Sequence, residues 1–285
     1  MAESERRAPA MPQDIDEKTP NAARVYDYYL GGEHNFTVDR ELGDRVAQTF
    51  PVIRQTAMLN RAWLRRVVVD ALESGVRQFL DIGSGVPTMG NVHEIVLSLL
   101  PAGERATVVY VDYEAVAVHH SRIVLERDGA TGWAAIVQED LRNPDGVFGH
   151  PETTRLIDFG RPVCLLMVSV LHFLGPDDGP ARLLDTYRSR LAPGSRLAIS
   201  HGTVDSLDPG DPLQERMTAL YRGSSNPTWM RGRAEIRAWF GDWPLLYYPD
   251  VVPLSDWLPE PDLELTEDEQ TARPFMWCGV AEKAH

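Results

Sequence analysis

The feature that most constrains the fold is an alternation of short apolar runs with longer amphipathic segments across the middle of the chain. Apolar runs of this length are typical of strands that are buried on both faces of a parallel sheet. Strands that alternate with helices predict repeated strand–helix–strand units, with helices on both faces. The expected strands are 78–85 (running into a glycine turn), 107–112, 134–141, 162–171 and 195–200, and the expected helices are 91–100, 113–127 and 176–194.

The segments before this alternation differ in composition. Residues 1–20 are polar and predict a disordered tail, whereas residues 21–75 predict a helical segment that could act as a lid. Within it we expect one helix from Asn21 to about Leu30, stopped by two glycines. A longer helix is expected from Pro51 to about Ser74.

The main domain is expected to cover residues 76–285, with an insertion at about 203–230 that breaks the alternation. Two further strands are expected at 245–252 and 273–283. The polar loop at 255–272 between them shows no crossover helix, so these strands are expected to be antiparallel to each other. The chain therefore predicts an α/β protein with a Rossmann-like, mostly parallel sheet of about seven strands.

The charge of the chain narrows the class of ligand. Lys and Arg number 28 against 42 Asp and Glu, which gives a formal net charge of −14. A field of this sign repels a phosphate backbone, so we expect a neutral or cationic small molecule rather than nucleic acid. There is no apolar leader, and no apolar run is long enough to span a bilayer. With Cys164 and Cys278 as buried thiols, these features predict a cytoplasmic protein without a membrane partner.

The central motif is Asp81-Ile-Gly83-Ser84-Gly85, which follows one expected strand and precedes a helix. Glycine lets a ligand approach the backbone closely, and the start of a helix offers free N–H groups. At the carboxyl edge of a parallel sheet, this arrangement favours a nucleotide-type ligand. The alternative is a tight strand-to-helix turn without a ligand.

A dinucleotide cofactor fits this motif poorly. Its fingerprint asks for a third glycine, where this chain has Thr88, and for an acid about 20 residues further on. The candidate acid, Asp112, comes 27 residues after Gly85.

Several motifs together resemble a known family. Asp81-x-Gly83-x-Gly85, Asp112 at the end of the second strand, the run EDL after the third strand and SVLH after the fourth resemble a class I S-adenosylmethionine-dependent methyltransferase. More narrowly, ARVYDYYLGG, the Asn60-Arg61 pair, GVPT followed by NVHE, and ISHG resemble an actinobacterial methyltransferase family that was long described only as a domain of unknown function.

The resemblance implies S-adenosylmethionine as cofactor and a role for each matching position. Asp81 and the turn at Gly83–Gly85 would hold its methionine end, Asp112 would accept hydrogen bonds from the ribose hydroxyls, and Asp140 would face the adenine amine. The alternative for each acid is an ordinary surface carboxylate. The full expected cofactor-binding set is Arg24, Tyr28, Gly32, Arg61, Asp81, Gly83, Ser84, Gly85, Asp112, Tyr113, Asp140, Leu141 and Ser169.

In such a family the N-terminal segment would fold over the cofactor as a lid. Arg24 would pair with the cofactor carboxylate, and Tyr26 or Tyr28 would pack on it. The alternative is a helix that packs on the core through its tyrosines and leaves Arg24 solvated. Arg61 is a second candidate for the carboxylate.

Two histidines are candidates for catalysis. His172 and His201 end the fourth and fifth expected strands, where a histidine could take a proton from the methyl acceptor. A structural histidine is the alternative for both. No set of Cys, His or carboxylate residues has a spacing typical of a metal site.

A late group of aromatic and sulfur side chains could roof an apolar substrate pocket or form an added core. The group consists of Tyr221, Trp229, Met230, Trp239, Phe240, Trp243 and Trp257.

The expected function is methyl transfer from S-adenosylmethionine to an unidentified small molecule. One alternative is a regulatory protein that binds this cofactor without catalysis. A nicotinamide-dependent oxidoreductase is the other.

Overall fold

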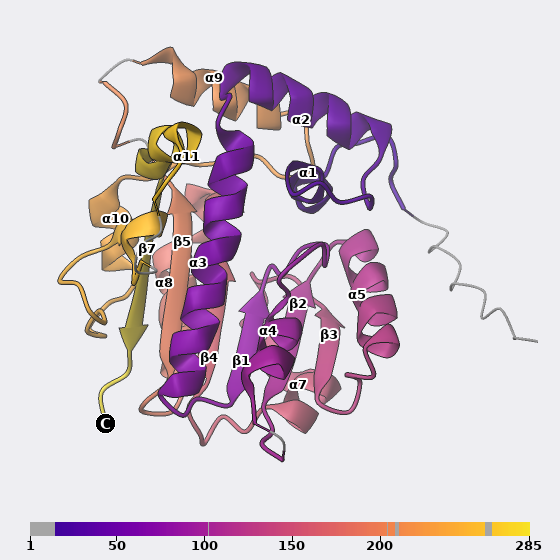
Figure 1. Ribbon diagram of the computed structural model, residues 1–285, viewed down its shortest axis with the longest axis vertical. Helices are drawn as coiled ribbons and strands as arrows, with labels where there is room; N and C mark the ends of the chain where they lie inside the picture. Colours follow the sequence, from indigo (N-terminus) through magenta and orange to yellow (C-terminus); the bar gives the residue numbers. More distant parts are fainter. Residues whose placement is uncertain (1–14, 102, 204, 209–210, 260–263) are drawn as a thin grey trace, which may run out of the picture.

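The computed structural model describes residues 15–101, 103–203, 205–208, 211–259 and 264–285. Its strands form one sheet in the order β3-β2-β1-β4-β5-β7-β6 (Figure 1). β1 to β5 are parallel, and β7 is antiparallel to both β5 and β6. The strands are β1 Gln78–Ile82, β2 Thr107–Asp112, β3 Ala134–Gln138, β4 Cys164–Val168, β5 Arg196–Gly202, β6 Val252–Pro253 and β7 Met276–Glu282. The expected α/β fold with a mostly parallel seven-stranded sheet is confirmed.

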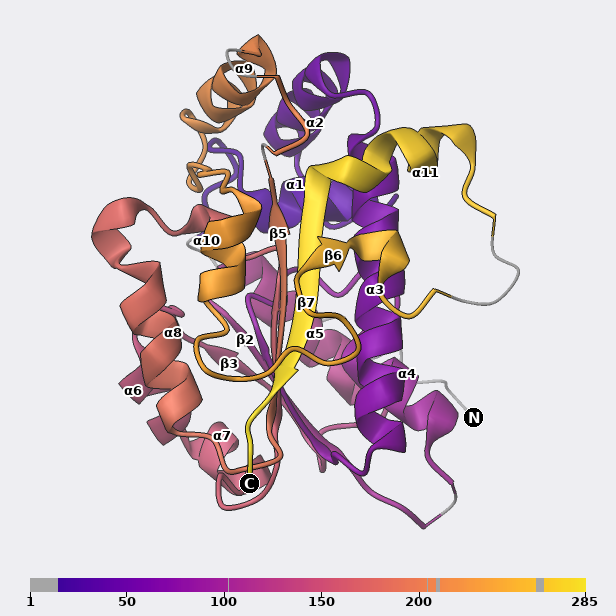
Figure 2. The same cartoon turned by 90° about the vertical axis from the view of Figure 1, so that its left-hand side faces the viewer.

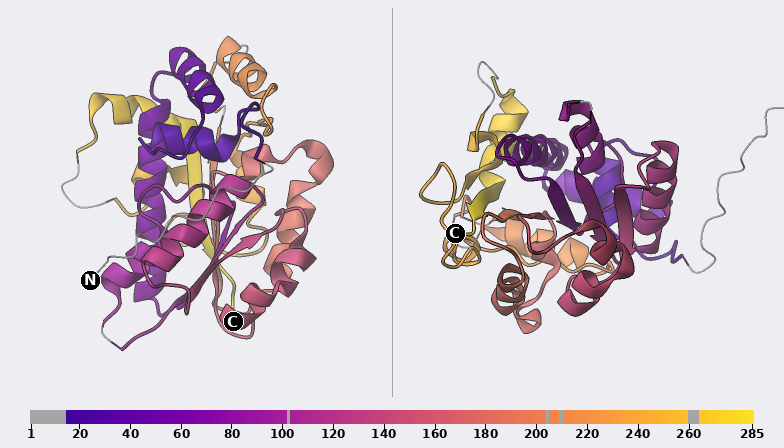
Figure 3. Two further views of the ribbon diagram at one scale, coloured as in Figure 1. Left: turned by 90° about the vertical axis from the view of Figure 1, so that its right-hand side faces the viewer. Right: turned by 90° about the horizontal axis from the view of Figure 1, so that it is seen from below.

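Helices cover both faces of the sheet (Figures 2 and 3). One layer contains α3 (Ile53–Glu73), α4 (Val92–Leu99) and α5 (Ala115–Arg127). The other contains α6 (Pro144–Gly149), α7 (Pro151–Leu156), α8 (Pro180–Ser189) and α10 (Arg233–Ala238). Short 3-10 helices lie at η1 Leu171–Phe173, η2 Pro176–Asp178, η3 Leu254–Asp256 and η4 Arg273–Phe275.

Each layer has its own hydrophobic core. Phe79 and Val108 pack in one core, and the residues that follow them, Leu80 and Val109, pack in the other. All four side chains are fully buried. Successive strand residues point to opposite faces, so a sheet that is covered on both faces requires apolar residues at every position. This explains the continuous apolar runs in the sequence.

Three further helices lie near the carboxyl ends of the parallel strands (Figure 1). They are α1 (Ala22–Tyr29), α2 (Thr37–Thr49) and α9 (Pro212–Tyr221). The helix α2 was not expected from the sequence; it begins where the Asp39 carboxylate accepts the Phe36 N–H at 2.8 Å. The chain adds β2 and β3 on one side of β1 and then adds β4 on its other side, so the strand order changes direction at β1. An open α/β sheet binds ligands at such a point.

A buried ion-pair network holds the N-terminal helices on the core. Arg24 donates from Nε to Asp39 at 2.8 Å and from Nη1 to Glu114 at 2.9 Å. Its Nη2 donates to the Thr19 carbonyl at 2.7 Å. Glu114 in turn accepts the Ala117 N–H at the start of α5. One guanidinium therefore connects α1, α2 and the end of β2.

The last third of the chain differs from the expectation. The expected strand 245–252 is wrong except for Val252, because Tyr247 has a positive φ of 67° and Leu245 forms only an isolated bridge. The loop at 255–272 contains a helix that was not expected, α11 (Glu267–Ala272), which begins with a capping box of Thr266 and Glu269. The antiparallel pairing of the two late strands is confirmed. Residues 1–14 of the expected tail lie outside the described residues.

Removal of the Arg24 guanidinium is expected to destabilise the protein strongly. Arg24→Ala would leave two buried carboxylates without their cation, which costs about 3–5 kcal/mol in the free energy of unfolding. Urea denaturation followed by tryptophan fluorescence would measure it. The exposed Arg45 of α2 provides the control, since Arg45→Ala should change this free energy by less than about 0.5 kcal/mol. Equal stability of the two variants would contradict the structural role of the network.

Candidate active site

The glycine turn after β1 is held by the neighbouring strand. Gly83 and Gly85 have positive φ angles of 70° and 68°, which side chains other than glycine rarely adopt. A Cβ on Gly83 would lie 2.2 Å from the Val170 side chain, whereas a Cβ on Gly85 would meet open space. The Gly85 N–H donates to Asp112 at 2.8 Å, and the Gly83 N–H donates to the Val111 carbonyl at 2.7 Å. The turn therefore exposes its backbone next to Asp112.

Two carboxyl groups are buried beside this turn. Burial raises the pKa of Asp81 to about 7 and that of Asp112 to about 6. Asp112 accepts two backbone N–H groups, from Gly85 and Glu114. Within the described ranges, the Asp81 side chain has no hydrogen-bond partner. The Arg61 charge lowers the pKa of Asp81 electrostatically, without a hydrogen bond between the two side chains. Asp81 is therefore a buried acid suited to a cation supplied from outside the chain.

A cavity of about 560 Å³ lies at this carboxyl edge. It extends from the ends of β1 to β3, past Ser169 after β4, to Met276 at the start of β7. Its lining includes most of the residues expected at the cofactor site, namely Arg61, Asp81, Gly83, Ser84, Gly85, Asp112, Tyr113, Asp140, Leu141 and Ser169. The fold thus brings residues from five separate segments into one site.

Three expected cofactor ligands lie elsewhere. Arg24 does not line the cavity and is neither solvated nor free, because the ion pairs with Asp39 and Glu114 occupy it. Tyr28 also points away from the cavity and donates to Asp44 at 2.8 Å. Gly32 is a packing position, since a Cβ there would lie 1.9 Å from the Asp27 carboxylate. All three residues contribute to the packing of the N-terminal segment. None of them lines the cavity in which the cofactor is expected.

Arg61 is the guanidinium that does line the cavity. It extends from α3 and donates from Nη2 to the Met89 carbonyl at 2.7 Å. Its charge lowers the pKa of Asp81, against the larger effect of burial. A zwitterionic group could therefore bind here, with its anionic part at Arg61 and its cationic part at Asp81.

The backbone at the end of β4 is strained. Ser169 has a φ of 53°, which is unfavourable for a side chain other than glycine and typical of functional positions. Its N–H donates to Ser200 Oγ at 3.0 Å, and Ser200 donates to Asn60 at 2.7 Å. Asn60 donates in turn to Tyr26 Oη at 2.9 Å. No role was expected for Asn60 from the sequence, because its partners are distant in the chain.

The two candidate histidines have different positions. His172 lines the cavity, and its Nδ1 has no hydrogen-bond partner among the described residues. Burial lowers the pKa of His172 to about 4, so its ring is neutral near pH 7. His201 is fully buried outside the cavity lining, between the Gly202 carbonyl and Arg231. His201 is therefore a structural histidine, and the expectation that it opens to the substrate cleft is wrong.

The late aromatic group divides into two sets. Tyr221, Trp229 and Met230 line the cavity. The other members are buried in the two hydrophobic cores, with Trp257 packed edge-to-face against Trp63. The first set therefore forms part of the cavity wall, and the second set forms added hydrophobic core, so each of the two expected roles applies to part of the group.

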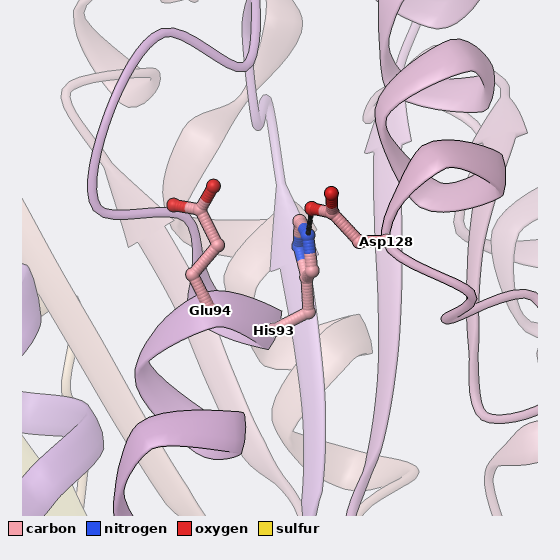
Figure 4. A group of neighbouring side chains, drawn as sticks. All are labelled: His93, Glu94 and Asp128. Carbon is pink, nitrogen blue, oxygen red and sulfur yellow. Dashed lines mark hydrogen bonds and ion pairs between the residues drawn. The ribbon is translucent and has the colours of Figure 1, made fainter.

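One cluster in the described part of the chain has the spacing of metal ligands: His93, Glu94 and Asp128 (Figure 4). His93 Nδ1 contacts Tyr110 Oη at 2.7 Å, and Nε2 contacts Asp128 at 3.2 Å. Glu94 accepts the Asn91 N–H as part of a capping box. Since both ring nitrogens already have partners, the cluster is explained by packing and capping.

Two polar residues of the cavity lining that were not expected from the sequence come from the insertion. Asn226 accepts the Ala22 N–H at 3.0 Å and donates to Tyr113 Oη. Thr228 lines the cavity with an unpartnered Oγ1. Neither residue belongs to a recognisable motif, and only the folded chain brings them to the strand ends.

The raised pKa values predict a specific pH dependence of stability without ligand. A carboxyl whose folded pKa exceeds its unfolded pKa stabilises the protein at low pH, and this stability is lost as pH rises through about 6 and 7. Asp81→Asn should therefore gain stability relative to the wild type as pH rises from about 4 to 7, by up to about 1.4 kcal/mol per pH unit, and the difference should level off above about pH 7. Denaturation at several pH values measures this difference. For the exposed control Asp177→Asn, the free energy of unfolding should depend on pH as in the wild type. If the pH dependence for Asp81→Asn also ran parallel to that of the wild type, titration of a buried Asp81 would be contradicted.

Comparisons with known proteins agree with this geometry. Residues 8–284 match the family described as S-adenosyl methyltransferase. A candidate methyltransferase from Thermobifida fusca YX has 36% identity and a TM-score of 0.82, covering 94% of this chain and 96% of its own. A DUF574 family protein from Streptomyces avermitilis MA-4680 has 32% identity and a TM-score of 0.84. The match covers 94% of this chain and 99% of that protein's chain. A comparison with curated proteins finds no match.

A more distant structure shows how widely the fold occurs. An O-methyltransferase family protein from Burkholderia thailandensis has 11% identity and a TM-score of 0.52, covering 94% of this chain and 65% of its own, so it shares the fold alone. Among the described residues, no helix is long and apolar enough to cross a membrane. The family match spans nearly the whole chain, which therefore belongs to the S-adenosyl methyltransferase family and uses S-adenosylmethionine as its cofactor.

Proposed function

We propose that the cavity at the carboxyl edge binds S-adenosylmethionine and a small molecule, and that the protein transfers the methyl group to this molecule. The observation that carries the proposal is the buried Asp81 carboxyl, which opens on the cavity without a protein partner. When bound, the cofactor supplies an electrophilic methyl group on a cationic sulfonium. The residues of the chain would bind and orient the two molecules and exclude water.

Asp81 and Arg61 would hold the methionine end. The ionised Asp81 carboxylate suits an ammonium group, and the Arg61 guanidinium suits a carboxylate. The backbone at Gly83–Gly85 gives room for close approach, because a Cβ at Gly85 would stand in open space. Ser84 supports this assignment, since its Oγ is buried without a partner and lines the same cavity.

Asp112 and Asp140 would hold the nucleoside. Asp112 uses its oxygens for two backbone N–H groups and retains lone pairs that can accept ribose hydroxyls. Asp140 is half-exposed at the end of β3 and paired with Arg142 at 3.2 Å. Tyr113 and Leu141, which follow these acids in the chain, also line the cavity and would pack on the base.

The N-terminal segment 21–75 and the insertion 203–230 would form a cover over the cofactor. The Ser225 N–H donates to the Pro20 carbonyl at 3.1 Å, and Asn21 Nδ2 donates to Ser225 Oγ at 3.2 Å. With the Asn226 contacts to Ala22 and Tyr113, these bonds join the two segments above the end of β2. A cover of this kind excludes water and fixes the reacting groups, and in well-oriented reactions alignment can lower the barrier by about 7–11 kcal/mol.

His172 is the candidate for accepting a proton from the methyl acceptor. It is neutral near pH 7, but a pKa of about 4 makes it a weak base. We therefore assign the larger effect to alignment and a supporting one to His172. The alternative of a regulatory protein keeps the same cofactor site and lacks turnover. The nicotinamide alternative has no support from the family or from the solved structures.

The test is thermal unfolding with S-adenosylmethionine, S-adenosylhomocysteine or NADH. A ligand at 100 times its dissociation constant adds about 2.7 kcal/mol, which raises the melting temperature by about 5–10 °C. The two adenosyl ligands should produce this rise, and Asp112→Ala should lose it. Asp177→Ala, which alters an exposed acid, should retain the rise.

Two results would decide against the proposal. A rise with NADH alone would contradict the cofactor site. Tight binding of S-adenosylmethionine, with no S-adenosylhomocysteine formed across a broad panel of small-molecule acceptors, would favour the regulatory alternative.

A further inference from the structure

The charged side chains that line the cavity gather at one end of it. They belong to the ends of β1 to β3 or, for Arg61, face Asp81 from α3. They are Arg61, Asp81, Asp112, Glu114, Glu139, Asp140 and Arg142. Over β4, β5 and β7, no charged side chain lines the cavity within the described part of the chain. The two ends of the cavity therefore suit ligands of different polarity.

Apolar side chains from four separate segments form the uncharged end. Phe50 follows α2, Met217 lies on α9, and Met276 begins β7. Leu64 of α3 completes this wall. All four side chains are buried, although they belong to a cavity. Methionine adapts to flat and irregular apolar ligands, and an aromatic ring offers a face for stacking.

A pair of hydroxyl groups interrupts this apolar wall. Tyr29 Oη and Tyr221 Oη lie 3.4 Å apart, both side chains are buried, and both line the cavity. Two hydroxyl groups carry two hydrogens, and their mutual bond uses only one. Among the described residues, neither hydroxyl makes another hydrogen bond. The pair therefore retains one buried donor that a ligand oxygen can satisfy.

We infer that the methyl acceptor is an uncharged, largely apolar molecule with at least one hydroxyl or carbonyl oxygen, which binds against the Tyr29–Tyr221 pair. This inference rests on the proposed function, because it assigns the uncharged end of the same cavity to the acceptor. A charged group at that end would lose its hydration and find no counter-ion on the cavity wall. The charges of Arg54 and Asp44 act on Tyr29 from behind the wall, and neither of them lines the cavity. Arg231 likewise acts on His172 without lining the cavity. An apolar molecule without an oxygen would leave the tyrosine donor unpaired.

The test uses four probes of similar size: 1-naphthol, naphthalene, naphthalene-1-carboxylate and 1-naphthylmethylammonium. Titration calorimetry at neutral pH measures each probe against protein saturated with S-adenosylhomocysteine. We expect 1-naphthol to bind roughly tenfold or more tightly than either charged probe. The cofactor product is titrated first, so a failure of the cofactor site is visible on its own.

Substitutions then assign the binding to this end of the cavity. Met217→Lys places a cation in the wall and should reverse the preference towards naphthalene-1-carboxylate. Glu215→Lys adds a lysine on the exposed side of the same helix and should leave the preference unchanged. The double variant Tyr29→Phe/Tyr221→Phe should bind 1-naphthol no better than naphthalene. Binding of S-adenosylhomocysteine should be the same in all variants, which shows that they are folded.

Three outcomes would overturn the inference. One is a charged probe that binds the wild type as tightly as 1-naphthol. Another is an absence of 1-naphthol binding while S-adenosylhomocysteine binds. The third is a Met217→Lys variant with the probe preference of the wild type. Loss of S-adenosylhomocysteine binding by the wild type would instead contradict the proposed function.

Discussion

The burial of Asp81 and Asp112 at the carboxyl edge of the sheet is the constraint on which the site depends. Burial raises the pKa of both groups, so the folded chain without ligand keeps Asp81 partly protonated near pH 7. A cationic ligand reverses the balance, since it adds a direct partner to the through-space effect of Arg61 on Asp81. The Asp81 side of the site thereby favours positive charge, in a protein whose net charge already favours cations.

The N-terminal segment is connected to this edge through polar groups as well as apolar packing. Arg24 joins α1 and α2 to Glu114, two residues after Asp112. Thr88, in the loop after the glycine turn, donates to Asp27 of α1 at 2.5 Å. The residue that replaces the third glycine of a dinucleotide fingerprint thus ties the turn to the helix above it. Ordering of the turn and of the N-terminal helices is therefore expected to be coupled.

The sequence was sufficient to predict the central sheet, because strands that are buried on both faces appear as continuous apolar runs and glycines mark the turn after the first strand. It was also sufficient to place Asp81 and Asp112 at strand ends. It failed where distant contacts decide the structure: Arg24 has the charge of a cofactor ligand, but Asp39 and Glu114 bury it. The strand expected at 245–252 is wrong because β propensity does not ensure a partner. β7 pairs there in a ladder with Val252 and Pro253, and Leu245 is joined to it by an isolated bridge.

The central claim is that a buried acid ionises when the cationic cofactor binds. Calorimetric titration with S-adenosylmethionine near pH 6.5, in two buffers with different enthalpies of ionisation, measures it directly. The account predicts release of a substantial fraction of one proton by the wild type, and a clearly smaller release by Asp81→Asn. Equal binding enthalpies in both buffers for the wild type would show that no proton leaves, which would contradict the account.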